Sequence, residues 1–163
     1  MSFVFSVVEV GEKKLAGIKV ETSMEKAARD CPDLWHTFGP RCEAELAEIA
    51  NLEGGAYGIS VMTGNEGSFT YWAAVEVSSD ASLPEGMAFT TIPAGLYVRC
   101  TVPGLEQLGS AFEAMYGEWP RSQGKYAISH DPQGVCFELY PLQPKPWDVT
   151  DPLEIYGPVV KKG

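Results

Sequence analysis

The chain has few basic residues and few histidines. Lys and Arg number 12 against 22 Asp and Glu, which gives a formal net charge of −10, and there are only 2 His. A chain with this charge has no excess of basic residues to neutralise phosphates or anionic lipid. We therefore expect no direct nucleic-acid contact and no membrane contact, and the sequence predicts neither a metal site nor a cofactor.

Cysteines and long apolar segments are also scarce. The 4 cysteines, Cys31, Cys42, Cys100 and Cys136, form no C-x-x-C pair, which is typical of reduced structural thiols rather than of a disulfide framework or a zinc site. The N-terminus lacks the basic segment and cleavage site of a signal peptide. No apolar run approaches the roughly 20 residues that span a bilayer. These absences predict a cytoplasmic protein.

Length and composition predict one globular domain over residues 1–163. The chain is long enough to bury a core, 45% of its residues are hydrophobic, and 17 Gly and 12 Pro divide it into short elements. Apolar residues at helical spacing predict two main helices. The first lies between Met24 and Leu52 and kinks or stops at Gly39-Pro40, and the second runs from about Leu105 to Trp119 and ends before Pro120.

Nine short alternating or apolar segments read as strands, and about eight strands are expected in one sheet. The segments that read as strands are Phe3–Val10, Leu15–Glu21, Tyr57–Thr63, Phe69–Ser78, Met87–Ile92, Leu96–Val102, Tyr126–His130, Val135–Tyr140 and Leu153–Val160. The first two are separated by Gly11–Lys14 and are expected to form a hairpin. Strands with only two main helices indicate an α+β fold.

The order of elements in the first half is repeated in the second half. Two short sequence echoes support a duplication: Ala16–Val20 against Ala94–Val98, and Tyr57–Ser60 against Tyr126–Ser129. We expect two βαββ repeats, at about residues 1–80 and 85–163, that form one antiparallel sheet with both helices on one face. A ligand groove is expected between the repeats.

The strand Val135–Tyr140 is the centre of the functional prediction. Its side chains alternate between the two faces of the sheet, so Glu138 shares a face with Cys136 and Tyr140. Two interpretations of Glu138 are open at this point. A strand glutamate that faces water is an ordinary solvated residue, whereas one that faces a cleft is a candidate site.

Aromatic motifs run through both halves of the chain. They are Leu34-Trp35-x-x-Phe38, Phe69-x-Tyr71-Trp72-Ala73-Ala74-Val75-Glu76-Val77, Ile92-Pro93-Ala94-Gly95-x-Tyr97, Tyr116-x-x-Trp119-Pro120, Phe137-Glu138-x-Tyr140 and Leu153-Glu154-Ile155-Tyr156-x-Pro158-Val159. With these motifs nearly the whole chain resembles the gyrase-inhibitor-like (GyrI-like) small-molecule-binding domain. That domain is also the effector-binding module at the C-termini of some AraC- and MerR-type transcription regulators.

The resemblance implies a pseudo-twofold pair of βαββ units, the SHS2-duplication fold, with a pocket for amphipathic and often cationic compounds. The family's acidic pocket residue corresponds to Glu138. The residues expected to bind the ligand are Glu138, Trp35, Tyr71, Tyr97, Trp119, Tyr140 and Tyr156. Where the family usually has a glycine, this chain has Ala73-Ala74, whose methyl groups are expected to narrow the pocket.

The sequence begins directly at the first strand of this domain. We therefore expect a stand-alone form, which acts as a homodimer, through a separate regulator protein, or as a free ligand binder.

The chemistry of the expected site favours a cationic ligand. A carboxylate removed from water either raises its pKa or binds a cation, and each well-placed aromatic ring adds about 0.5–2 kcal/mol of cation–π attraction. A hydroxyl of Tyr140 or Tyr156 is expected to donate to Glu138 and hold it ionised. The sequence therefore predicts binding of amphipathic cationic or aromatic small molecules by a ligand sensor or a sequestering protein.

Other interpretations stay open. The first is a small-molecule hydrolase in which Glu138 is the general acid or base and Tyr140 or Tyr156 assists. A weaker alternative is a protein-binding inhibitor of gyrase. Large apolar residues at helical spacing are also more often core than pocket, and those concerned are Trp35, Phe38, Phe112, Met115 and Trp119.

Overall fold

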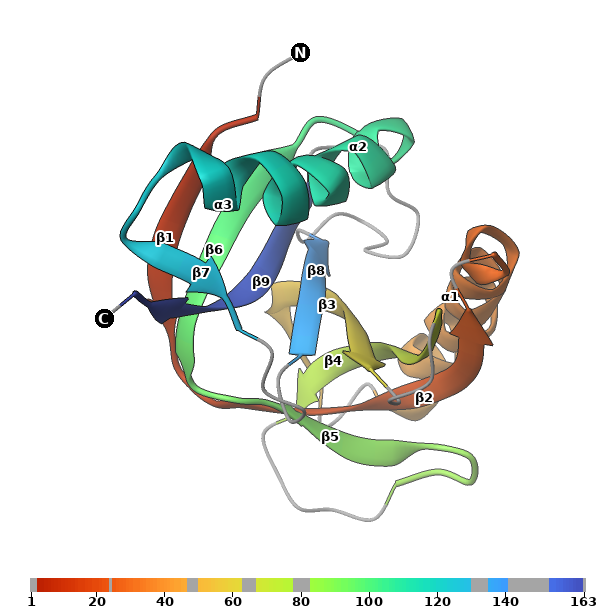
Figure 1. Ribbon diagram of the computed structural model, residues 1–163. Helices are drawn as coiled ribbons and strands as arrows, with labels where there is room; N and C mark the ends of the chain where they lie inside the picture. Colours follow the sequence, from red (N-terminus) through yellow and green to blue (C-terminus); the bar gives the residue numbers. More distant parts are fainter. Residues whose placement is uncertain are drawn as a thin grey trace.

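The computed structural model describes residues 3–23, 25–46, 50–62, 67–77, 83–129, 135–140 and 153–162. These residues form an α+β fold with nine strands (Figure 1). The elements are β1 (Phe5–Val10), β2 (Lys13–Ser23), α1 (Ala27–Glu45), β3 (Ala50–Met62), β4 (Ser68–Val77), β5 (Ala88–Ile92), β6 (Gly95–Val102), η1 (Leu105–Gln107), α2 (Leu108–Glu113), the π-helix η2 (Ala114–Glu118), α3 (Trp119–Ser122), β7 (Tyr126–Ile128), β8 (Val135–Tyr140) and β9 (Leu153–Lys161).

The strand order has twofold symmetry. It is β1-β6-β9-β8-β3-β4-β2-β5, with β7 added on β9. Exchanging β1 with β5, β6 with β2, β9 with β4 and β8 with β3 reproduces the same order, as expected for two βαββ units. The echo of Ala16–Val20 in Ala94–Val98 joins the equivalent strands β2 and β6, whereas the echo of Tyr57–Ser60 in Tyr126–Ser129 joins β3 to β7 and is not part of the repeat.

The predicted hairpin of β1 with β2 is wrong. β1 pairs with β6, and β2 pairs with β5 and β4. The β1–β6 ladder ends at Val10↔Gly95, and the β2–β5 ladder resumes at Lys13↔Ile92 in the same register. The chain therefore bends at Gly11-Glu12 without reversing, because a turn-like sequence allows a bend as well as a reversal.

The β1–β6 pair and the β2–β5 pair, at opposite ends of the sheet, are consequently two halves of one continuous two-stranded ribbon. The β1–β6 end and the β2–β5 end are linked by this bend, and the sheet curls (Figure 1). The strand residues on the face away from the helices form a core of their own. At its centre the Phe137 ring stacks on Tyr156 at 4.5 Å and meets the rings of Tyr97 and Tyr57 at 5.4 and 6.0 Å.

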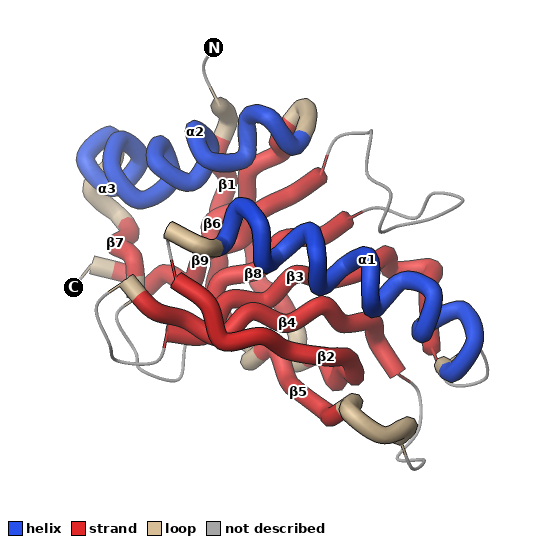
Figure 2. The backbone as a smooth tube through the Cα atoms, turned by 90° about the vertical axis from the view of Figure 1, so that its right-hand side faces the viewer, coloured by secondary structure: helices blue, strands red, loops and turns tan. Residues whose placement is uncertain are grey.

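The opposite face of the sheet carries the helices, as predicted (Figure 2). From α1, Phe38 and Cys42 are buried against this face, and Ala111 and Met115 are buried there from the second helical segment. This face forms the larger core, where α1 packs mainly on β2 and β4 and α2 packs on β6.

Both helical segments continue past the prolines that were expected to interrupt or end them. α1 extends beyond Pro40 to Glu45, and the burial of Cys42 and Leu46 offsets the lost backbone hydrogen bond. The second segment continues through Pro120, which lies in α3 directly after the π-helix η2. The first helix also ends earlier than Leu52, because β3 begins at Ala50.

No helix in the described ranges is long and apolar enough to cross a membrane. None of the four cysteines takes part in a disulfide.

Phe137→Ala is expected to lower the free energy of unfolding by about 3–5 kcal/mol, because the ring is 1% exposed and contacts three tyrosine rings. The matched control is Phe89→Ala, whose ring is 40% exposed and whose loss is expected to change stability by about 0.5 kcal/mol or less. Urea denaturation measures both. Small and equal losses would contradict a second core on the face without helices.

Candidate functional site

Glu138 lies in β8 at the centre of the sheet and faces the helices. β8 is flanked by β3 and β9, and the neighbouring strand residue Phe137 belongs to the opposite face. Glu138 is 6% exposed, one of only two buried polar or charged residues in the part of the chain that the structure describes. The interpretation of Glu138 as a solvated strand residue is therefore wrong.

Three aromatic side chains hold the Glu138 carboxylate. The hydroxyl of Tyr71 in β4 donates to Oε1 of Glu138 at 2.9 Å, and the hydroxyl of Tyr140 donates to the same oxygen. The indole Nε1 of Trp35 in α1 donates in turn to the Tyr71 hydroxyl at 3.0 Å. The Trp35 ring also meets the Tyr140 ring edge-on at 5.3 Å. Two strands thus supply the donors to one oxygen, and α1 supports one of these donors through Trp35.

A glycine makes room for this network. Gly58 in β3 lies between Ala73 of β4 and Glu138 of β8. A methyl group at Gly58 would lie 2.2 Å from the Tyr71 hydroxyl and 2.9 Å from Glu138 Oε1. Of the two alanines expected to narrow the pocket, only Ala73 belongs to the helix-side core, since Ala74 belongs to the opposite core.

Burial dominates the electrostatics of Glu138. It raises the pKa of the carboxyl above its ordinary value of 4.5, and the hydrogen bonds from Tyr140 and Tyr71 oppose this rise. No Lys or Arg of the described ranges pairs with Glu138. The ion pairs found there join other carboxylates: Lys13–Glu76, Arg29–Asp30, Arg41–Glu45 and Arg99–Glu154.

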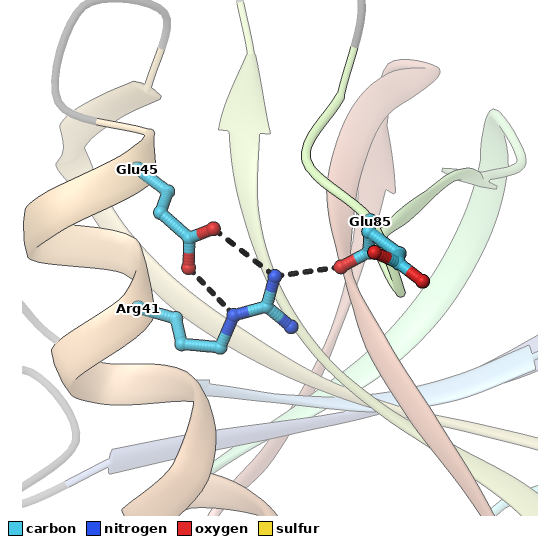
Figure 3. Close-up of polar contacts among 3 residues, drawn as sticks. All are labelled: Arg41, Glu45 and Glu85. Carbon is cyan, nitrogen blue, oxygen red and sulfur yellow. Dashed lines mark hydrogen bonds and ion pairs between the residues drawn. The ribbon is translucent and has the colours of Figure 1, made fainter.

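Of the two arginines of α1, Arg41 lies in the C-terminal part of the helix and is engaged there. Arg41 Nε contacts Glu45 Oε2 at 2.6 Å, and its Nη2 donates to the backbone carbonyl of Glu85 at 2.7 Å (Figure 3). The bond to Glu45 raises the pKa of Arg41. This contact fixes α1, which carries Trp35, to the segment that leads into β5.

Two thiols lie near Glu138. Burial, with Glu138 and Asp30 as lesser causes, raises the pKa of Cys31 to about 12. Burial also raises the pKa of Cys136. Both thiols are therefore neutral at physiological pH and supply no compensating charge. The strand alternation indicated Cys136, but the proximity of Cys31 could not be predicted because it depends on how α1 packs on the sheet.

The second helical segment brings Tyr116 to the same strand. The Tyr116 ring is 40% exposed and stacks on Phe112 at 6.3 Å. Burial and a hydrogen bond with Cys136 raise the pKa of its hydroxyl. A methyl group at Gly157 would lie 3.1 Å from this hydroxyl. Tyr116 lay in a recognised motif but was not expected at the site, because π-helical geometry is not visible in the hydrophobic periodicity.

Three of the expected aromatic residues are placed away from the Glu138 network. Tyr97 and Tyr156 belong to the face without helices, where Tyr97 donates to the Pro93 carbonyl at 2.7 Å and Tyr156 to Glu154 at 3.0 Å. The expectation that Tyr156 donates to Glu138 is therefore wrong. Trp119 lies on the helix side, packed in the core with its ring 6.4 Å from Phe5.

Gly58→Ala is expected to separate Tyr71 from Glu138 and to lower the free energy of unfolding by about 1–3 kcal/mol. Gly109→Ala in α2 is the control, because a methyl group there meets nothing within 4 Å and favours the helix by up to about 1 kcal/mol. Thermal unfolding and tryptophan emission measure the two effects. A Gly58 variant as stable as wild type would contradict the tight packing at the carboxylate.

The stability of the unliganded protein is expected to depend on pH through the protonation of Glu138. The folded protein holds this proton more tightly than the unfolded chain, so the contribution of Glu138 is present below pH 4.5 and is lost as the pH rises through its raised pKa. Glu138→Gln still accepts from the phenols and buries no charge. Denaturation at pH 4.5 and pH 8 measures the free energy of unfolding of both proteins. The stability of Glu138→Gln relative to wild type should rise with pH, and the opposite trend would refute a raised pKa.

Comparison with known proteins places the chain in a family. Residues 6–159 match Cass2, described as an integron-associated effector binding protein. The transcriptional regulator BrlR of Pseudomonas aeruginosa is 33% identical over 128 residues, which cover 77% of this chain and 45% of BrlR. The chain therefore spans less than half the length of that regulator.

Two solved structures share the fold. SAV2435 bound to tetraphenylphosphonium has a TM-score of 0.70 at 19% identity, over 98% of this chain and 94% of that chain. The C-terminal domain of EcmrR has a TM-score of 0.70 at 14% identity, over 99% and 100% of the two chains. The resemblance predicted from the motifs is confirmed, and the chain belongs to the Cass2 family of integron-associated effector binding proteins.

Proposed function

We propose that this chain binds amphipathic, cationic or aromatic small molecules as effectors and that Glu138 supplies the negative charge that attracts them. The observation that carries the proposal is a buried carboxylate without a cationic partner among the described residues. Burying an unpaired charge is costly. A bound cation would remove that cost and would be attracted to the ionised form of Glu138.

The side chains around Glu138 favour an apolar, flat ligand. Trp35 and Tyr140 lie on the α1 side, and Tyr116 with its partly exposed ring lies on the side of the second helical segment. Each aromatic face adds about 0.5–2 kcal/mol of cation–π attraction, depending on desolvation. The tetraphenylphosphonium bound to SAV2435 is a cation with an apolar aromatic surface, although its phosphorus is tetrahedral and the ion is not flat.

The relatives support a proposed biological role. BrlR is a transcriptional regulator and shares this segment, so we propose that the chain senses its effector in the cytoplasm or sequesters it. It would act as a homodimer or through a separate regulator protein. We propose that the effector binds between the two repeats.

Hydrolysis is a second candidate function. A carboxyl group with a raised pKa beside two phenols has the protonation behaviour of a general acid or base. In this candidate the assisting hydroxyl belongs to Tyr140 or Tyr71, because Tyr156 is on the opposite face. Turnover of the effector, seen as a change in its mass, would separate this candidate from simple binding.

Tetraphenylphosphonium is the probe that tests the proposed function. We expect wild-type protein to bind it and Glu138→Gln to bind it at least about tenfold more weakly, because the variant keeps the hydrogen bonds and loses only the charge. Calorimetry and tryptophan fluorescence measure the affinity, and mass spectrometry follows the probe.

The matched control is Glu76→Gln. Glu76 is also a strand glutamate, but it pairs with Lys13 at 3.4 Å and accepts from Tyr57 at 2.8 Å. Its replacement should leave the affinity unchanged. Equal affinities for wild type and Glu138→Gln would exclude Glu138 as the counter-charge.

A further inference from the structure

The two carboxylate oxygens of Glu138 have different surroundings. Oε1 accepts from both Tyr71 and Tyr140. No donor in the described ranges reaches Oε2. A carboxylate oxygen has about two acceptor positions, so both positions of Oε1 are filled, whereas Oε2 receives no donor from the residues that the structure describes. A buried acceptor without a partner destabilises the site that contains it.

The donors near the carboxylate are already used. The Trp35 indole donates to Tyr71, and the Tyr116 hydroxyl is engaged with Cys136. The groups that face Glu138 are the thiols of Cys31 from α1 and Cys136 from β8, together with the phenols of Tyr71 and Tyr140, and all of them are neutral at physiological pH. A neutral thiol is only a weak donor, so an N–H group on the ligand would meet only weak competition at Oε2 from the described residues.

Resting on the proposed function, we propose that the effector carries a protonated nitrogen that donates an N–H to Oε2 of Glu138. The preferred effectors are then flat aromatic amidinium, guanidinium or ammonium ions, rather than fully substituted onium ions of the same size. A charge-assisted N–H···O bond is shorter and about twice as strong as a neutral one. A fully substituted ion gains only the Coulomb attraction and leaves Oε2 without a donor.

A matched pair of acridines tests this preference. The first is 9-aminoacridine in its protonated form, and the second is 9-dimethylamino-10-methylacridinium, which has the same ring system and charge but no N–H. Wild-type protein is expected to bind the first at least about tenfold more tightly. Calorimetry at neutral pH gives both affinities.

Two variants show whether Glu138 is the origin of the preference. Glu138→Gln is expected to abolish it, because the amide oxygen takes the two phenols and the amide NH₂ then occupies the position of Oε2. Tyr140→Phe leaves Oε2 unchanged and is expected to retain the preference. Circular dichroism shows whether each variant is folded. If Glu138→Gln does not fold, the preference for the first acridine can still be measured in Tyr140→Phe.

The outcomes separate this proposal from the function on which it rests. Equal affinities of wild type for the two acridines, or a preference that survives in folded Glu138→Gln, would overturn the hydrogen bond to Oε2. The tetraphenylphosphonium experiment is independent, since that ion has no N–H. Failure of wild type to bind any of the three cations would overturn the proposed function, and this inference with it.

Discussion

The site depends on one interaction, the solvation of the Glu138 carboxylate by two phenols instead of by water or a basic side chain. Two hydrogen bonds to one oxygen stabilise the charge in part, while burial still raises the pKa of the group. The carboxylate is thus held in place by neutral groups. No Lys or Arg of the described residues neutralises its charge, and the proposal that Glu138 attracts a cationic ligand rests on this.

The fold makes this arrangement possible because each face of the sheet has its own core, and helices cover only one of them. The continuous ribbon of β1–β2 with β5–β6 lets the sheet curl and bury Phe137 and its tyrosine neighbours without helices. The helices are then needed on one face only, where α1 and the second segment approach β8 from two sides. Gly58 provides the space in which Tyr71 reaches the carboxylate.

Sequence reasoning predicted the α+β fold and the approximate positions of the helices, because hydrophobic spacing is a local property. The family resemblance implied the grouping of Trp35, Tyr71 and Tyr140 with Glu138, and the structure brings these four residues together. Tyr97 and Tyr156 were grouped with them but lie on the opposite face of the sheet, since their motifs carry no information about which face a neighbouring strand presents. The hairpin of β1 with β2 failed for a related reason. Strand pairing is a long-range choice, and only the register with β5 and β6 shows that Gly11-Glu12 is a bend.

The most direct test of the account is the protonation of Glu138 itself, followed by ¹³C NMR of glutamate side-chain carboxyl carbons and assigned with Glu138→Gln. The account predicts that this carboxyl titrates above the ordinary value of 4.5 in the free protein and that bound tetraphenylphosphonium lowers its midpoint. A midpoint at or below 4.5 that does not respond to the cation would contradict a buried, unpaired carboxylate as the basis of the site.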